Sequence, residues 1–234
     1  MSQETISLSA VASATATATA TARCRTNLAL HHLFAACRFA AQIGQIERDN
    51  VGKPFGDFWE EIFQYSLGVA TLTVALLESY VNEHLADGAL SNGSLPSKAT
   101  ESIAALIDRE PILVKFNLVL ELRTGRSLDF GANVVQCADL LIKLRNSVIH
   151  FRPEWDDESA TLAKLSSKLQ NRFMSSPYFP NEDLFPRAWA TRSFSSWALQ
   201  STIAFLEHFG QESGLDSKLA PFRERLSLFS DGSV

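Results

Sequence analysis

Apolar residues recur along most of the chain at intervals of three and four, which is the period of an amphipathic helix. Outside an Ala-Thr repeat near the N-terminus, no segment alternates apolar and polar residues as a half-buried strand does. Stretches rich in Gly, Pro, Asn and Ser separate the periodic segments. The pattern predicts an all-α fold, with helices over residues 27–47, 57–86, 98–108, 111–122, 133–151, 158–173, 188–212 and 216–229.

Residue types at the ends of several segments support these boundaries. Asn27 is a typical N-cap, Pro111 suits a first helical turn, and Gly125 follows the 111–122 helix as a stop signal. Three prolines exclude regular structure from residues 175–186, so a long connection is expected there. The side chains expected in the core of the 27–47 and 188–212 helices are Leu28, Leu30, Leu33, Phe34, Phe39, Trp189, Phe194, Trp197, Ile203, Phe205 and Leu206.

The helix predicted over residues 133–151 is apolar around most of its circumference. On a wheel of about 100° per residue, Lys143, Asn146 and His150 fall within roughly 40° of Asp139 and form one polar stripe. An ordinary surface helix has an apolar arc of only about 100°. Because the apolar part of this helix is much wider, we expect neighbouring elements to cover it on more than one side.

Arg145 interrupts the apolar band, about 140° from His150 on the same wheel. A guanidinium cannot lose its proton to escape burial, so Arg145 needs either a partner or an opening to solvent. Arg145 and His150 can serve one ligand only if the last turn relaxes before Pro153, the Arg side chain swings round, or a second subunit completes the site. The simpler alternative is C-terminal capping that offsets the helix dipole.

Residues 140–153 resemble the signature of the HEPN superfamily, the higher eukaryote and prokaryote nucleotide-binding domains. The signature is an Arg followed by a polar residue and, after a short spacer, a His near a helix end, as in Arg145, Asn146 and His150. Upstream, residues 75–82 are similar to the family's Glu and Asn pattern through Glu78 and Asn82. The resemblance covers residues 57–155, and residues 188–212 resemble the closing helix.

This resemblance implies an up-and-down helical bundle with additional peripheral helices, and a homodimer in which two copies of the motif share a cleft. Many members are metal-independent endoribonucleases of toxin or other defence systems, and others are inactive partners. By analogy, Arg145 and His150 would be catalytic and Asn146 would support them, with RNA as substrate, an antitoxin or regulatory protein as a further partner, and no cofactor. The alternative is a non-catalytic domain that binds a nucleotide, RNA or protein through the same cleft.

The chemistry of these residue types suits RNA cleavage. The 2′-hydroxyl of RNA attacks the adjacent phosphorus, which requires a proton acceptor and stabilisation of charge on the phosphoryl oxygens. A His titrating near neutrality exchanges such a proton, and Arg binds phosphate in a bidentate manner. The expected products carry a 2′,3′-cyclic phosphate and a 5′-hydroxyl, and DNA is not cut.

Four further residues have candidate supporting roles. Lys143 and Arg152 could contact RNA phosphates, or they could be solvated surface charges without a function. Glu78 and Asn82 lie on an apolar helix face and therefore need internal partners. They could orient Arg145 or the loop beside it, or they could tie two helices together.

Composition limits the remaining possibilities. The chain has 234 residues, enough for one core, so we expect a low-complexity segment at 1–22 and a single domain at 23–234. A formal net charge of −5 argues against a diffuse basic surface for nucleic acid. The three cysteines have no metal-ligand spacing, no metal site is predicted, and neither a secretory signal nor an apolar run of about 18 residues is evident. A cytoplasmic protein that does not contact a membrane is expected.

Overall fold

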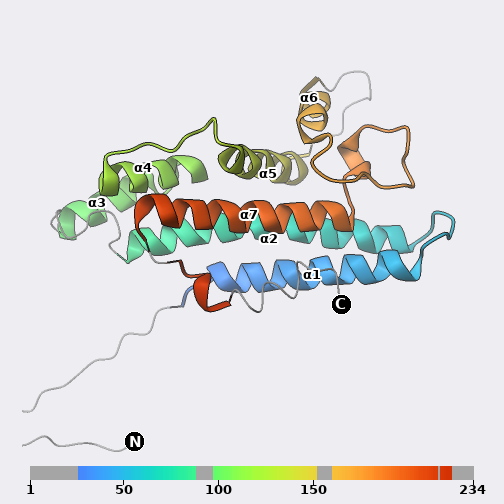
Figure 1. Ribbon diagram of the computed structural model, residues 1–234, viewed down its shortest axis with the longest axis horizontal. Helices are drawn as coiled ribbons and strands as arrows, with labels where there is room; N and C mark the ends of the chain where they lie inside the picture. Colours follow the sequence, from blue (N-terminus) through green and yellow to red (C-terminus); the bar gives the residue numbers. More distant parts are fainter. Residues whose placement is uncertain (1–25, 88–96, 152–159, 216, 223–234) are drawn as a thin grey trace, which may run out of the picture.

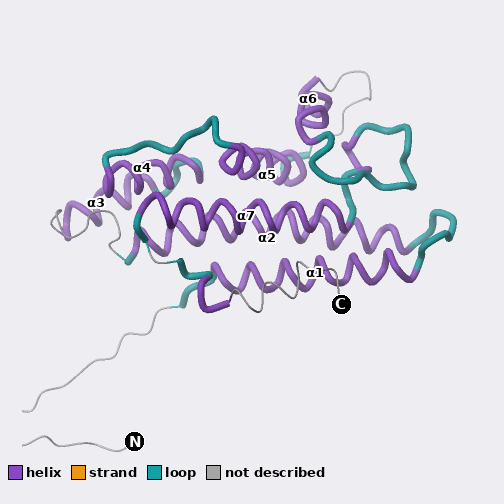
Figure 2. Tube along the Cα trace, viewed as in Figure 1, coloured by secondary structure: helices purple, strands orange, loops and turns teal. Residues whose placement is uncertain are grey.

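The computed structural model describes residues 26–87, 97–151, 160–215 and 217–222, and every regular element in those ranges is helical (Figure 2). The predicted all-α fold class is therefore confirmed. The segment at 1–22 lies outside the described residues. The α-helices are α1 (Ala29–Asp49), α2 (Phe58–Ala86), α3 (Ser97–Ile107), α4 (Ile112–Thr124), α5 (Asn133–Ile149), α6 (Ala160–Leu169) and α7 (Arg192–Ser213), with a π turn η1 (Leu184–Ala188) and a 3-10 turn η2 (Ala220–Phe222).

Helices α2 and α7 form the centre of the bundle. Helix α1 packs against both of them on one side, and α4 and α5 pack against both on the other (Figure 1). Helices α3 and α6 are peripheral: α3 contacts α2, and α6 contacts α5 and η1. Large side chains that are fully buried, such as Leu77, Phe116 and Phe205, fill the space between these layers.

Helix α1 begins at Ala29 with Leu28 at its N-cap, so the predicted cap at Asn27 is wrong. The Ala29 amide donates instead to Oε1 of Glu83 in α2, at 2.8 Å. A carboxylate from a packed neighbour thus satisfies a free N–H of the first turn. Leu28 is 50 % exposed and does not join the core, whereas Leu33 is fully buried.

Helix α7 begins at Arg192, four residues later than predicted. Thr191 is the N-cap, and its hydroxyl accepts a hydrogen bond from the Phe194 amide at 3.0 Å. The preceding Trp189 was expected in the helix but lies just before it, fully buried, with its indole N–H donating to the carbonyl of Pro186. The ring of Trp189 packs against Phe194, which anchors the connection that leads into α7.

Other boundaries also differ from the sequence pattern. Helix α6 ends at Leu169 rather than at 173, because Asn171 adopts a left-handed backbone with φ of 65° and reverses the chain. Helix α5 ends at Ile149, two residues early. Of the helix predicted over 216–229, the described residues contain only η2.

Helix α2 is more apolar than its neighbours. Among the described helices, it alone has the length and hydropathy of a membrane span, although no continuous apolar run of that length was expected from the sequence. The central helix of a bundle meets the same test because neighbours surround it. α2 packs against α1, α4, α5 and α7, and it buries the polar side chains of Ser66, Thr73, Glu83 and His84.

Candidate functional site at the end of α5

Helix α5 carries the candidate motif and is in contact with three other helices. It packs against α2, α6 and α7, which confirms that neighbours cover it on more than one side. Its buried residues are Val135, Cys137, Ala138, Leu140, Leu141 and Leu144. The backbone that carries Arg145 and Asn146 is therefore fixed by the core, while the helix end beyond it reaches solvent.

His150 is the C-cap of α5. Its φ of −104° and ψ of 25° depart from helical values, and its amide donates to the carbonyl of Asn146 at 2.9 Å. The last turn thus relaxes at His150, so the ideal wheel no longer describes the direction of its side chain. The imidazole is exposed and makes no hydrogen bond or ion pair with another described residue. Within the described part of the chain, nothing covers this side chain.

Arg145 is half-buried beside the fully buried Leu144. Its Nε atom is shielded from solvent and has no hydrogen-bond partner among the described residues. No described carboxylate pairs with the guanidinium. A buried donor without a partner costs about 1–3 kcal/mol. The sequence required either a partner for Arg145 or an opening to solvent, and the structure shows a partial opening to solvent. No carboxylate of the described chain neutralises its positive charge.

Lys143 differs from Arg145 in this respect. Its ammonium forms an ion pair with Asp139 one turn earlier, and both side chains are substantially exposed. Asn146 is exposed on the same face. Arg152 lies outside the described residues. The roles of these residues in phosphate binding stay predictions, and the ion pair with Asp139 reduces the charge that Lys143 offers to a ligand.

Glu78 and Asn82 contact Lys115 of α4. The Lys115 ammonium, on a side chain only 1 % exposed, donates to Oδ1 of Asn82 at 3.1 Å and lies 3.9 Å from Oε1 of Glu78. These contacts tie α2 to α4, which agrees with the alternative that Glu78 and Asn82 connect two helices. No described hydrogen bond or ion pair joins Glu78 or Asn82 to Arg145, and their orienting role stays a prediction.

Lys115 is a polar core residue that the sequence interpretation missed. It falls between Ile112 and Val119 on the buried face of α4, at the three- and four-residue spacing of core positions. A lysine on such a stripe has to find an internal partner. That spacing was the signal that could have paired Lys115 with the two polar residues on the apolar face of α2.

Exposed apolar residues flank His150 in the sequence. Ile149 is 52 % exposed and Phe151 is 46 % exposed, on either side of His150 in the sequence. Large apolar side chains that gather beside a polar site are typical of a surface that another molecule covers. The end of α5 therefore carries a guanidinium and an imidazole without an ion-pair partner among the described residues, and two exposed apolar residues, Ile149 and Phe151, here called the apolar rim.

Outside the end of α5, the histidines and cysteines of the described residues do not assemble a second site. His31 is exposed and His32 is half-buried on α1. Within the described ranges, no three His, Cys, Asp or Glu side chains lie close enough together to hold a metal ion. Cys37 and Cys137 are both buried, on α1 and α5.

Comparisons with family models, with curated proteins and with solved structures find no match to this chain. The chemistry of the end of α5 is therefore inferred from its own residues.

Proposed function

We propose that this protein is a metal-independent endoribonuclease in which Arg145 binds the scissile phosphate and His150 transfers the proton. The observation that carries the proposal is the pairing, at one helix end, of a guanidinium without a described carboxylate partner and an exposed imidazole. The same two residue types at the same spacing underlie the resemblance to the HEPN signature. A role in a toxin or defence system, with an antitoxin as partner, is part of this proposal by analogy alone.

The proposed reaction needs only the RNA and these side chains. The imidazole of His150 accepts the proton of the 2′-hydroxyl. The 2′-oxygen forms a bond to phosphorus while the bond from phosphorus to the 5′-oxygen breaks. The leaving 5′-oxygen takes a proton from water and becomes a hydroxyl, and the His150 imidazolium returns its proton to the solvent. Arg145 offsets the charge that builds on the phosphoryl oxygens. The products are a 2′,3′-cyclic phosphate and a 5′-hydroxyl.

We propose further that two copies of the chain form the cleft. Ile149 and Phe151 provide apolar surface next to the motif, and a two-fold axis through that surface would place two Arg145 and two His150 side chains around one cleft. In that arrangement the Arg145 of one copy would lie beside the His150 of the other, which is one of the three ways in which the two residues can serve one ligand.

The decisive experiment is an RNA cleavage assay in EDTA. Purified wild-type protein should cut single-stranded RNA, leave cyclic phosphate ends, and leave DNA of the same sequence intact. Arg145→Gln and His150→Asn should each slow cleavage by at least about 100-fold, because each removes electrostatic or acid-base catalysis.

Two matched variants control for charge and residue type. Arg126→Gln removes an exposed Arg that pairs with Glu212, and His31→Asn removes an exposed His on α1. Both should cleave at the wild-type rate. Cleavage that survives His150→Asn in a protein with an unchanged circular dichroism spectrum would refute the proposal.

The second candidate is a non-catalytic domain that binds RNA, a nucleotide or a protein at the same place. The exposed Ile149 and Phe151 favour it, because an apolar rim serves binding as well as catalysis. Under this alternative, fluorescence anisotropy would detect RNA binding that depends on Arg145, while product ends never appear at any enzyme concentration.

A further inference from the structure

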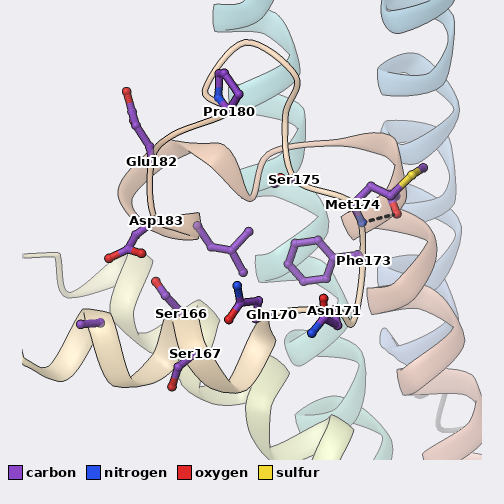
Figure 3. Close-up of a pocket in the computed structure, with 13 residues that line it drawn as sticks. Ser166, Ser167, Gln170, Asn171, Phe173, Met174, Ser175, Pro180, Glu182 and Asp183 are labelled. Atoms are coloured by element: carbon purple, nitrogen blue, oxygen red, sulfur yellow. Dashed lines mark hydrogen bonds between the residues drawn. The ribbon is translucent and has the colours of Figure 1, made fainter.

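A pocket of about 790 Å³ lies away from the Arg145 and His150 motif, between α6, the loop over 171–184 and the start of α7 (Figure 3). None of its lining residues belongs to the motif. Next to the pocket, the Arg172 guanidinium donates to Oδ1 of Asn133 at the opposite end of α5. The volume is in the range of about 300–1,000 Å³ that small-molecule sites occupy.

The walls of this pocket are fixed by hydrogen bonds and packing. Left-handed Asn171 ends α6 and turns the chain so that Phe173 enters the core, where its ring contacts Phe194 edge-on at 5.3 Å. The Met174 amide donates to Oγ of Ser193 at 2.9 Å, and the Thr191 hydroxyl donates to the Met174 carbonyl at 3.0 Å. The loop is thus attached to the start of α7 and the pocket is preformed.

The charge on the pocket is negative. Both oxygens of Glu182 accept hydrogen bonds from Arg187, at 2.8 and 2.6 Å, so this carboxylate is already neutralised. Asp183, by contrast, has no hydrogen bond or ion pair with a described residue and is exposed at the rim. No described lining residue is a Lys, Arg or His. At the described lining residues an anion would therefore meet the carboxylate of Asp183 and no cation, whereas a cation would gain Asp183 as a partner.

The interior adds neutral hydrogen-bonding groups and an apolar wall. Ser166 is 6 % exposed, and its Oγ accepts only a long hydrogen bond of 3.4 Å from the Phe185 amide. Figure 3 shows the Ser166 hydroxyl and the Gln170 amide directed into the pocket, with the Phe173 ring across from Asp183. Phe173 and Leu184, both largely buried, provide the apolar surface.

We propose that this pocket binds an ammonium or guanidinium group carried on a short apolar stem. The cation pairs with Asp183, its N–H groups donate to Ser166 and Gln170, and the stem lies against Phe173 and Leu184. A guanidinium offers several donors to such a set of acceptors. The cation could belong to a small molecule or to a Lys or Arg side chain of a protein. Both sources present an ammonium or guanidinium group on an apolar stem.

The test is an NMR titration of the full-length, ¹⁵N-labelled protein with butylguanidinium and with its neutral isostere, butylurea. Butylguanidinium should shift the amide signals of Ser166 and Gln170 saturably, and butylurea should bind at least about tenfold more weakly. Butyrate should not bind. N-acetyl-arginine methylamide distinguishes the sources: tighter binding than butylguanidinium indicates a protein side chain, and weaker binding indicates a free amine.

Variants complete the test. Asp183→Asn keeps the shape of the side chain but should weaken butylguanidinium binding about tenfold and abolish its dependence on ionic strength. Asp108→Asn, an exposed Asp outside the pocket, and His150→Asn should both bind like the wild type. If the pocket binds butylurea as well as butylguanidinium, or if Asp183→Asn has no effect, the proposal is overturned.

Discussion

Arg145 and Lys143 are two residues apart on α5, yet their charges have different environments. Lys143 reaches back one turn to Asp139, while the guanidinium of Arg145 has no carboxylate partner in the described chain and its Nε is enclosed without a hydrogen bond. The difference follows from helix geometry, because only Lys143 has an acid four residues earlier. Among the described residues, Arg145 is therefore the cation of α5 without a carboxylate partner, which supports its proposed role in binding a phosphate.

Lys115 shows how one buried charge organises its neighbours. Its ammonium is almost fully enclosed and depends on Asn82 and Glu78 for hydrogen bonding and charge compensation. Removing one member of such a group leaves the other uncompensated, which costs more than replacing the whole group with apolar side chains. Glu78 and Asn82 of α2 thus have a packing role within the chain, as partners of Lys115.

His84 is a buried imidazole near the end of α2. It is 6 % exposed, its Nε2 has no hydrogen-bond partner among the described residues, and its ring contacts Tyr80 edge-on. Burial lowers the pKa of His84 to about 4, and the positive charges of Lys218 and Arg123 add to this, while Asp87 and Glu83 oppose it. At neutral pH the folded protein therefore holds His84 uncharged.

We expect this imidazole to make the fold sensitive to acid. Below its ordinary pKa of about 6.5, the unfolded chain protonates His84 while the folded chain does not, so the free energy of unfolding falls as the pH drops from 6.5 toward 4. The loss should be about 1–3 kcal/mol. Urea unfolding between pH 7 and pH 4 should show a shallower pH dependence for His84→Gln than for the wild type.

The difference between variants is the quantity to measure, because other groups titrate in the same range. Burial raises the pKa of Glu47, which favours the folded state as the pH falls and so opposes His84. His31→Gln, at an exposed position, should retain the wild-type pH dependence. Equal slopes for His84→Gln and the wild type would contradict this explanation.

At the scale of the element, contacts between segments decide where helices start. Helix α1 begins where Glu83 of α2 accepts a hydrogen bond from the Ala29 amide. Helix α7 begins at Thr191, whose hydroxyl accepts from the Phe194 amide and donates to the Met174 carbonyl. The sequence pattern had predicted starts at residues 27 and 188, and these contacts move both starts further along the chain. A first turn begins where its free N–H groups find acceptors, and those acceptors can come from other parts of the chain.

The N-cap of α7 should therefore carry measurable stability. Thr191→Ala removes the acceptor for the Phe194 amide and the donor to Met174, and should lower the free energy of unfolding by about 1–2 kcal/mol. Thr191→Ser keeps the hydroxyl and should lose much less. Guanidinium chloride unfolding of the three proteins measures this, and equal losses in Ala and Ser variants would show that the methyl group matters rather than the cap.

At the scale of the whole molecule, we propose that the apolar rim formed by Ile149 and Phe151 mediates self-association. Wild-type protein should be a dimer by light scattering after gel filtration. Ile149→Glu and Phe151→Glu should each yield monomers with impaired RNA cleavage, because a charge would be buried in the proposed interface. Val51→Glu, at a side chain 80 % exposed near the turn after α1, should remain dimeric. A monomeric wild-type protein that cleaves RNA would separate the activity from the dimer.

Much of the fold and part of the candidate site followed from local pattern. The 3.6-residue period located α2 to within a residue and placed α1, α4, α5 and α7. The same period put Arg145 among apolar residues and foresaw the cover on α5. These inferences succeeded because the direction of a side chain from a helix depends only on its position in the sequence.

The tertiary structure decided which partners the buried polar groups found. Lys115 donates to Asn82, and Glu83 accepts from the first turn of α1. Burial lowers the pKa of His84. Each of these environments is built from segments that are distant in the sequence. The pocket with Asp183 arose in the same way, from α6, an irregular loop and α7. The sequence determines on which face of its helix a polar residue lies. Only packing of the helices determines what is opposite that face, since the contact energy depends on groups that are far apart along the chain.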